Sequence, residues 1–491
     1  MIFRIKSNKI YIKNYTPRFL NYLNENLKAY NEMHKKAKFM NIPQYKIPEY
    51  LYFYNINKKE DEIVLNIALL HKIEHFFNKE DIETQLKLNY KQKHRNIQEN
   101  IALLSEENSK KGIKLYPYQE QALKTILNAY SNNKKVGILE ARPGSGKTEI
   151  FLKLIHDLKL KTLVIAHTVD LIKQTKERLD NYYNYNTYIL NNKDMQYKTK
   201  DADVVFATIQ TLINSKDFVK NSFDLVIIDE CHHYPSNGKK NAENKYIKKI
   251  YDLNFKFLLG VTATNFRADF KIEDESIPLL ASLGETFYRI EKEDTAKNTI
   301  QKVDIKTIQT NFSIYNIKEK YKEVDGTASW SGVINSIAED KNRNDIIIIE
   351  TINQIKQKRK VIILCDRVKH VEILYNLFNK YTKKIAIFEG KTRKKERDLI
   401  IEKAKDGEID IILTNYKIFT EGIDLPNFDT LLFATPRKFK GTMQQSIGRI
   451  QRIDKNNKDK KPLLIDIVDT EIKFLRKMAI ERNKFYKQEK Y

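Results

Sequence analysis

The stretch VGILEARPGSGKTEIFLKLIHDL, residues 136–158, contains a short apolar run, a glycine-bearing loop and a helical pattern in direct succession. This strand–loop–helix order is the setting in which a glycine-rich turn becomes a phosphate site. Gly144 and Gly146 permit backbone angles that other residues resist, so successive N–H groups can point around an anion. The helix that begins near Lys147 adds the positive end of its dipole. The stretch therefore predicts a site for a nucleoside triphosphate.

Each residue of this loop has an expected role. The loop that holds the phosphates consists of Pro143, Gly144, Ser145 and Gly146. Lys147 is expected to reach the terminal phosphates, and Thr148 to hold a magnesium ion. Ala141 stands where the strict pattern has its first glycine, which leaves the G-x-G-K-T core intact. The alternative is a chance glycine turn before a helix, and the flanking patterns disfavour it.

A pair of acids further along the chain completes the expected site. The run LVIIDECHH places Asp229 and Glu230 directly after the apolar residues 225–228. In a parallel α/β sheet this is the carboxyl end of a strand, where ligands bind. Asp229 suits a magnesium ion, and Glu230 suits the orientation and deprotonation of an attacking water. Alone, such a pair is weak evidence, because acids after strands are often simply solvated. Together with the phosphate loop it predicts hydrolysis.

Two blocks of β-branched, apolar runs alternate with helical patterns such as 169–183 and 367–381. The runs of the first block are 137–141, 162–167, 203–208, 225–230 and 257–264, and those of the second are 361–366, 385–390, 409–415, 430–435 and 463–469. Short, nearly continuous apolar runs are typical of parallel strands covered on both faces. Each block therefore predicts a doubly wound α/β domain.

The chain is expected to divide into a small α+β N-terminal domain, two α/β domains and a basic helical tail. The corresponding ranges are 1–110, 111–295, 296–475 and 476–491, with the polar stretch 291–302 as the connection between the α/β domains. The N-terminal domain could bind nucleic acid by stacking bases on its aromatic residues. These residues are Tyr45, Tyr50, Tyr52, Phe53 and Tyr54. Core and half-buried sheet positions are the favoured interpretation for them.

Composition limits the classes of protein that remain. A chain of 491 residues exceeds what one hydrophobic core usually supports. Its net charge of +24 favours a polyanionic partner, although Lys, Asn, Ile and Tyr are abundant throughout and make this a weak argument. No apolar run approaches the length of a membrane span, and a membrane partner is not expected. The only two cysteines, Cys231 and Cys365, lie at predicted strand ends, which disfavours disulfides or zinc and favours a reducing compartment.

The ordered motifs ARPGSGKT, DECH, VTAT and QQSIGRIQR resemble those of superfamily-two helicases and translocases. The segments LYPYQEQAL, LVIAHTVDLIKQT, VVFATIQTL, VIILCDRVKHVEIL and TEGIDLP also match that pattern. The resemblance covers about residues 112–470. Within this superfamily, the chain most resembles the UvsW-like group of phage and viral helicases, near the XPB-like branch. The resemblance implies two tandem RecA-like doubly wound parallel-sheet domains behind the small α+β domain.

The resemblance implies roles for residues of the first block. Gln119 would hydrogen-bond the adenine, because its amide offers both a donor and an acceptor. His232 would link hydrolysis to nucleic-acid engagement. Thr262 and Thr264, in VTAT, would connect the nucleotide site to the path of the nucleic-acid strand. Asn265 stands where that motif commonly continues with proline.

In the second block, Gln445, Gly448, Arg449 and Arg452 fit the pattern Q-x-x-G-R-x-x-R. The two arginines are three residues apart and would share one face of a helix. The resemblance implies that they act as arginine fingers on the triphosphate, the alternative being two solvated surface arginines.

Further residues are expected beside the nucleotide or the nucleic acid. Gly422 and Asp424, in TEGIDLP, would approach the nucleotide. The resemblance places Thr168, Thr208 and Thr420 at positions whose hydroxyls contact the backbone of the nucleic acid. The basic cluster in 390–398 adds Lys391, Arg393, Lys394 and Lys395, for which a solvated helix start is an equal alternative.

The sequence thus predicts an ATP-dependent DNA helicase or translocase that remodels branched nucleic acid such as forks, junctions and R-loops. ATP and Mg²⁺ are the expected cofactors, DNA the expected partner, a monomer the expected state and the cytoplasm, or a host's cytoplasm, the expected location. Alternatives are an RNA helicase, the motor subunit of a restriction system, and a nucleic-acid-dependent ATPase without strand separation. A binding protein with a decayed motor is disfavoured, because the lysine, the threonine, both acids and both arginines are intact.

Overall fold

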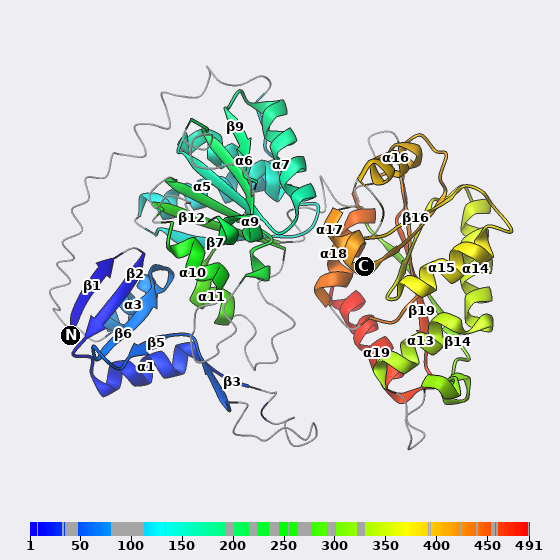
Figure 1. Ribbon diagram of the computed structural model, residues 1–491, viewed down its shortest axis with the longest axis horizontal. Helices are drawn as coiled ribbons and strands as arrows, with labels where there is room; N and C mark the ends of the chain where they lie inside the picture. Colours follow the sequence, from blue (N-terminus) through cyan, green and yellow to red (C-terminus); the bar gives the residue numbers. More distant parts are fainter. Residues whose placement is uncertain are drawn as a thin grey trace. The chain divides into compact units, whose positions relative to one another are not determined.

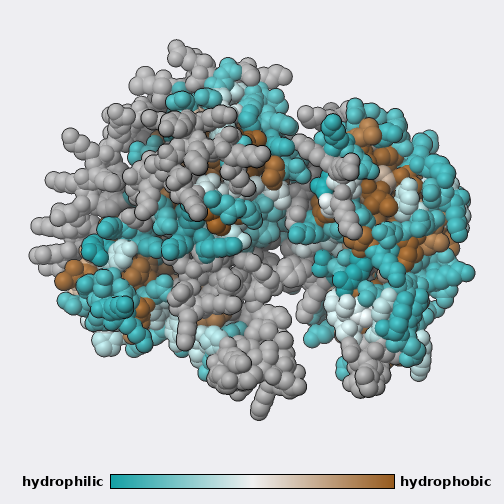
Figure 2. All heavy atoms as spheres, in the orientation of Figure 1, coloured by the Kyte–Doolittle hydropathy of each residue, from teal (hydrophilic) through white to brown (hydrophobic). Residues whose placement is uncertain are grey.

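The structure is a computed structural model that divides into two compact units, one with residues 1–142 and 146–291 and the other with 143–145 and 292–491 (Figure 1). The residues that it describes are 1–6, 8–31, 34, 48–79, 112–132, 134–191, 201–215, 223–234, 245–253, 255–263, 277–291, 294, 301–321, 329–390, 392, 394–422, 425–437, 440–452, 457, 460–489 and 491. Figure 2 shows a mostly hydrophilic face on each unit, with scattered hydrophobic patches. Within the described residues, no helix is both long and apolar enough to cross a membrane.

The first unit opens with a small antiparallel sheet. Its described strands, in the order β1-β2-β6-β5, are β1 (Ile2–Lys6), β2 (Lys9–Lys13), β6 (Glu62–Asn66) and β5 (Asn55–Asn57). The helices α1 (Pro17–Leu27) and α3 (Leu70–Lys79) bury Phe19 and Phe76 against each other, with ring centroids 5.1 Å apart. This is the α+β domain that the sequence predicts. A separate ribbon pairs β3 (Lys28–Tyr30) with β4 (Tyr50–Tyr52).

The aromatic residues of the N-terminal domain divide into two groups. Phe53 and Tyr54 are buried, as the favoured interpretation expects. Tyr50 and Tyr52 lie in β4 and remain partly exposed, and the ammonium of Lys28 lies 3.8 Å from the ring centre of Tyr50. Tyr45 falls outside the described residues.

A parallel sheet forms the centre of the first unit. Its described strands, in the order β13-β7-β12-β11-β8-β10-β9, are β13 (Thr286–Ile290), β7 (Val136–Ala141), β12 (Phe257–Thr262), β11 (Leu225–Asp229), β8 (Thr162–Ala166), β10 (Val204–Thr208) and β9 (Thr187–Ile189). The five predicted runs are all strands here, whereas β9 and β13 were not expected.

Both faces of this sheet are covered. The helices α5 (Pro117–Ser131), α6 (Lys147–Leu158) and α7 (Val169–Tyr182) share one core, and α9 (Ile209–Asn214), α10 (Lys245–Tyr251) and α11 (Ile277–Leu283) share the other. Along β11, Ile227 joins the first core while Val226 and Ile228 join the second. This alternation, with every residue buried, explains the continuous apolar run in the sequence.

The N-terminal domain and the parallel sheet belong to one unit. The core of the N-terminal domain continues into the core beneath α10 and α11. The side-chain amide of Asn66 donates to the carbonyl of Ala281 at 3.3 Å. Glu285 pairs with Lys134 and lies 4.0 Å from the imidazole of His71.

The second unit repeats the parallel architecture. Its described strands, in the order β14-β19-β18-β15-β17-β16, are β14 (Asp304–Thr310), β19 (Leu463–Asp469), β18 (Thr430–Phe433), β15 (Val361–Cys365), β17 (Ile411–Asn415) and β16 (Ile385–Phe388). The helices are α13 (Trp330–Glu339), α14 (Lys341–Lys356), α15 (Val368–Phe378), α16 (Lys394–Lys405), α17 (Tyr416–Gly422), α18 (Lys440–Ile450) and α19 (Lys473–Gln488). One face of the sheet packs on α14 and α15, and the other on α16 to α19.

Two features of this unit differ from the simplest expectation. The strand β14 was not expected, because its exposed edge position leaves it polar at most residues. The expected tail, 476–491, lies largely within α19, which begins at Lys473 and buries Leu475, Phe485 and Tyr486. Two parallel, doubly wound sheets and a small α+β domain are nevertheless the fold class that the sequence predicts.

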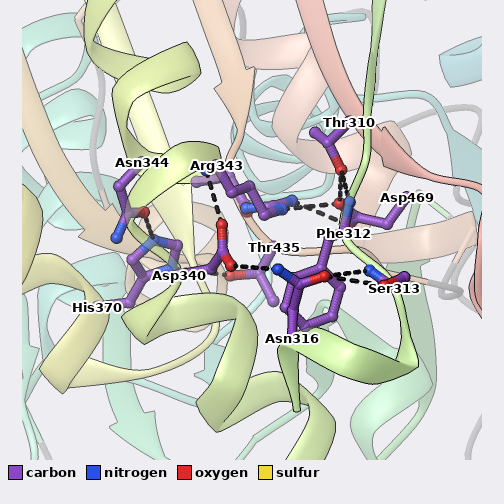
Figure 3. Close-up of polar contacts among 11 residues, drawn as sticks. Thr310, Phe312, Ser313, Asn316, Asp340, Arg343, Asn344, His370, Thr435 and Asp469 are labelled. Carbon is purple, nitrogen blue, oxygen red and sulfur yellow. Dashed lines mark hydrogen bonds and ion pairs between the residues drawn. The ribbon is translucent and has the colours of Figure 1, made fainter. Parts of the chain in front are cut away.

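A buried arginine ties α14 to the sheet of the second unit (Figure 3). Arg343 donates through Nε to Asp469 at 2.9 Å, and also to the carbonyl of Ala434. Asp340 accepts from the backbone N–H of Arg343 at 2.8 Å and so caps the helix. Burial, reinforced by the charge of Arg343, lowers the pKa of His370 to about 3. The guanidinium therefore joins α14, β18 and β19 in a dry environment.

Replacing Arg343 with methionine is expected to lower the free energy of unfolding of the second unit by about 3–5 kcal/mol, because Asp469 would remain a buried carboxylate without its cation. Urea unfolding followed by the fluorescence of Trp330, the chain's only tryptophan, measures this loss. Lys384→Met is the control: Lys384 is 59% exposed and lies 3.9 Å from Asp410. Such a surface pair contributes at most about 1 kcal/mol. Equal losses in the two variants would contradict the role of Arg343.

Candidate active site

The phosphate loop joins β7 to α6 in a conformation that requires its glycines. Gly144 has φ +82° and Gly146 has φ +74°, both in the left-handed region that side chains with a Cβ resist. Gly146 is the N-cap of α6, so Lys147 and Thr148 occupy the first turn of that helix. Backbone N–H groups without helical partners and the helix dipole therefore meet at this loop.

Gln119 packs directly against the loop. It is buried in the first turn of α5, and its Oε1 accepts from the backbone N–H of Tyr116 at 2.8 Å. A Cβ on Gly146 would lie only 2.2 Å from Nε2 of Gln119. The sequence predicts that this amide offers adenine both a donor and an acceptor. Its oxygen receives a hydrogen bond from the Tyr116 N–H, and its action on adenine stays a prediction.

The phosphate-loop lysine meets both predicted acids. Nζ of Lys147 contacts Oε1 of Glu230 and lies 3.2 Å from Oδ1 of Asp229. Asp229 ends β11, and Lys147 begins the helix after β7. The two strands lie on either side of β12, so their carboxyl ends converge at one edge of the sheet as the sequence predicts.

The charges of this cluster depend on one another. Burial alone would lower the pKa of Lys147, but Asp229 and Glu230 raise it above its ordinary value. Burial raises the pKa of Asp229. Burial also acts to raise the pKa of Glu230, yet the charge of Lys147, and then that of His232, outweigh it and hold this pKa at about 2. Lys147 and Glu230 are therefore both ionised at neutral pH.

A polar chain leads away from Glu230. Nδ1 of His232 lies 3.4 Å from Oε2 of Glu230 and 2.9 Å from Oγ1 of Thr262. Thr262 is fully buried at the end of β12. Glu230 itself has φ +49°, a conformation that costs a side-chain-bearing residue about 1–3 kcal/mol. Two of the predicted coupling residues thus touch each other, whereas Thr264 lies outside the described residues.

His232 also belongs to a row of three imidazoles, and the sequence predicts no role for the other two. The ring centroid of His233 lies 4.1 Å from that of His232 and 4.4 Å from that of His167, with the ring planes tilted by 38° and 43°. His167 follows β8, so the row spans two strand ends. The second histidine of DECHH was the only signal of this arrangement in the sequence.

The arginines of the second unit differ from the prediction in one respect. Gln445, Gly448 and Arg449 lie on α18, and the guanidinium of Arg449 is 5.8 Å from the ring centre of Phe419. The helix ends at Ile450, so Arg452 lies beyond it. The prediction that both arginines share one helical face is therefore wrong, and their action on a triphosphate stays a prediction.

The threonines predicted to contact nucleic acid have local structural roles. Oγ1 of Thr168 accepts from the N–H of Leu171 at 3.3 Å and caps α7. Oγ1 of Thr208 accepts from the N–H of Thr211 at 3.1 Å and caps α9. A threonine directly before a helical pattern signals such a cap, and the sequence analysis missed it. Thr208 is the last residue of β10 and Thr168 comes two residues after β8, so both caps lie at the carboxyl edge of the sheet.

Several predicted residues cannot be placed in atomic detail. Thr420 and Gly422 belong to α17, and Lys394 and Lys395 begin α16, with Lys395 exposed. The residues outside the described ranges are Asp424, Lys391 and Arg393. Their roles stay predictions.

Comparison with known proteins decides the family. Residues 112–267 match the family described as "Type III restriction enzyme, res subunit", and residues 343–454 match "Helicase conserved C-terminal domain". The chain belongs to the superfamily-two helicases. It is an ATP-dependent helicase, and the family predicted from the motifs is confirmed.

Individual relatives of this helicase come from archaea, yeasts and viruses. The "DNA 3'-5' translocase XPB2" of Sulfurisphaera tokodaii is 27% identical over 389 residues, which are 72% of this chain and 82% of that protein. A putative ATP-dependent RNA helicase of Acanthamoeba polyphaga mimivirus is 28% identical over 390 residues, 77% of this chain and 68% of that protein. The crystal structure of T4 UvsW covers 99% of this chain and 96% of its own, with 16% identity and a TM-score of 0.42.

Replacing Gly146 with alanine is expected to weaken the binding of a fluorescent ATP analogue by about tenfold or more. The added Cβ would displace Gln119 and strain a backbone at φ +74°. Gly112→Ala is the matched control, because Gly112 has φ +63° but no atom within 4 Å of an added Cβ. That variant carries the same kind of backbone strain and should bind the analogue as the unmodified helicase does. Equal weakening in the two variants would show that the contact with Gln119 is unimportant.

Proposed function

We propose that this helicase is an ATP- and Mg²⁺-dependent motor on DNA that remodels branched substrates such as forks, junctions and R-loops. The observation that carries the proposal is the cluster of Lys147, Asp229 and Glu230 at one edge of a doubly wound sheet. The cluster brings a phosphate-binding cation and two acids of distinct pKa to the loop whose backbone suits an anion.

The residues of the cluster fit the chemistry of ATP hydrolysis. Thr148 and Asp229 offer the oxygen ligands that Mg²⁺ prefers, and the ion would neutralise charge on the phosphates. Lys147 would transfer its contacts from the acids to the phosphates. Glu230 would then lose the charge that holds its pKa at about 2 and become a stronger base for the attacking water.

The second unit would complete catalysis. Arg449 and Arg452 would stabilise the charge that develops on the transferred phosphoryl group, and Gly422 and Asp424 would lie beside the nucleotide. His232 and Thr262 would transmit the state of Glu230 to the end of β12. Alternating association of the two units around ATP would then move the protein along a strand.

DNA is the favoured partner, and RNA is the alternative. The net charge of +24 suits either polyanion, and the relatives are named for DNA translocation and for RNA helicase activity. Grip on phosphates from Thr168, Thr208 and Thr420, with Lys391 and Arg393, would tolerate any base sequence. We further propose that the protein acts as a monomer in the cytoplasm, or in that of a host if a phage or virus encodes it.

Phosphate release from ATP is expected to rise when nucleic acid is added, and Glu230→Gln is expected to lower the stimulated rate by about 10²–10⁴-fold while ATP still binds. Lys147→Ala should lose binding as well, because it removes the cation that meets the phosphates. Glu177→Gln, an exposed glutamate of the same unit, serves as the control and should hydrolyse normally. Normal turnover in Glu230→Gln would exclude Glu230 as the base.

The same assay identifies the substrate. Forked DNA, a four-way junction, an R-loop, single-stranded DNA and single-stranded RNA are compared as stimulators and as substrates for strand separation. The proposal requires the branched DNAs to be both the strongest stimulators and the substrates that are remodelled. Preference for RNA would favour the RNA helicase, and stimulation without remodelling would leave a nucleic-acid-dependent ATPase.

Replacing Arg452 with alanine is expected to lower turnover by about 10³-fold with little change in ATP affinity, since an arginine finger acts mainly in the transition state. Rates of phosphate release and titrations with an ATP analogue separate the two effects. Arg452→Lys keeps the charge but not the planar fork, so an intermediate rate is expected. Parallel losses of affinity and rate would argue that Arg452 only binds the ground state.

A further inference from the structure

Two exposed aromatic rings lie in contact at the carboxyl edge of the second sheet. Trp330 begins α13 and Phe474 lies in the first turn of α19, which follows β19. Their ring centroids are 5.8 Å apart, with planes inclined at 64°. Trp330 is 44% exposed and Phe474 is 39% exposed. The chain thus keeps its only tryptophan at the surface, held against a second ring.

Trp330 and Phe474 are not members of the buried hydrophobic cluster that lies between α13 and α19. The neighbours Val333, Ile334, Ile472 and Leu475 are buried in a small cluster between α13 and α19. Single exposed apolar residues are ordinary. Two large exposed rings in contact, at the edge of an α/β sheet where ligands bind, instead mark a candidate binding site.

Cations surround the pair. Arg367, the second residue after β15, donates to Oγ of Ser331, the neighbour of Trp330, at 3.0 Å. Asp366 lies 3.2 Å from a guanidinium nitrogen of Arg437 and 3.9 Å from Nε of Arg367, so two arginines flank one carboxylate. On α19, exposed Lys473 and Lys477 stand beside Phe474, with Glu471 before the helix. Positive charge therefore exceeds negative charge around the rings.

We propose that Trp330 and Phe474 form a stacking platform for the bases of single-stranded nucleic acid, and that Arg367 and the α19 lysines meet the phosphates of the same strand. The inference rests on the proposed function, because it concerns the polymer on which the motor moves. Aromatic rings set in a basic groove are the common means of holding a single strand without sequence preference, since every base has a π-face. The planar guanidinium of Arg367 suits a phosphate better than an ammonium does.

Trp330 reports directly on the test. Titration of the full-length helicase with oligothymidylate is expected to quench tryptophan fluorescence in a saturable manner, in step with the anisotropy of a labelled oligonucleotide. Phe474→Ala keeps the reporter and should weaken binding by about 5- to 150-fold, the range for losing one base–aromatic contact. Quenching that depends on protein concentration without oligonucleotide would overturn the proposal in favour of contact with a second copy.

Variants of the platform separate stacking from charge. Trp330→Ala should weaken binding of the labelled oligonucleotide over the same range without changing the salt slope, and Trp330→Phe should restore most of the affinity. Arg367→Ala should reduce the slope of log K against log salt by about 0.7, the value for one phosphate of a single strand. Tyr381→Ala is the control, because Tyr381 is 65% exposed but follows α15, at the opposite edge of the sheet.

Folding and function are checked separately. Each variant is compared by circular dichroism and by its affinity for an ATP analogue, which should not change. If oligonucleotide stimulates ATP hydrolysis while Trp330 fluorescence and the affinity of Trp330→Ala stay unchanged, the platform is wrong and the proposed function stands. If no nucleic acid stimulates hydrolysis at all, the proposed function is wrong, and the stacking platform that rests on it is wrong as well.

Discussion

The contact of one ammonium with two carboxylates is the constraint on which the active site depends. Lys147, Asp229 and Glu230 come from a helix start and a strand end, and only the parallel sheet brings them together. Each charge would be costly to bury alone, so the three stabilise one another. The same contact links binding to catalysis, because moving Lys147 onto phosphate removes what holds the pKa of Glu230 at about 2. In the proposed mechanism, Lys147 would therefore set both the affinity for phosphate and the strength of Glu230 as a base.

The surrounding backbone is strained where this cluster requires it. Gly144 and Gly146 have positive φ angles, which glycine adopts readily. Glu230 also has a positive φ angle, although its side chain disfavours that conformation. Such strain persists only where neighbouring contacts fix the conformation. For Glu230, these contacts are Lys147 on one side and His232 on the other. In the proposed mechanism, a change at Glu230 would reach Thr262 and β12 through His232.

Much of the fold and of the catalytic cluster is predictable, and the misses share a physical cause. Strands buried on both faces leave continuous apolar runs, and a phosphate loop requires glycines, so both are visible in sequence. The edge strand β14 is missed because its exposed side chains are polar. The contact of Asn66 with Ala281 joins residues 215 positions apart, which no local pattern encodes. Arg452 is misplaced because no glycine or proline marks the end of α18 at Ile450.

The buried arginine of the second unit explains how a surface platform can be held in place. The backbone N–H of Arg343 donates to Asp340 at the end of α13, and its guanidinium donates to Asp469, the last residue of β19 before α19, so Arg343 connects the helices that carry Trp330 and Phe474 (Figure 3). Its third contact, Ala434, precedes Thr435, whose hydroxyl accepts from the backbone N–H of Asp366 at 3.1 Å. Arg367 follows directly. A buried ion pair is a poor source of net stability, but its directional hydrogen bonds permit one arrangement of the elements around it. The elements that carry the two rings and Arg367 thus meet at one buried residue, Arg343.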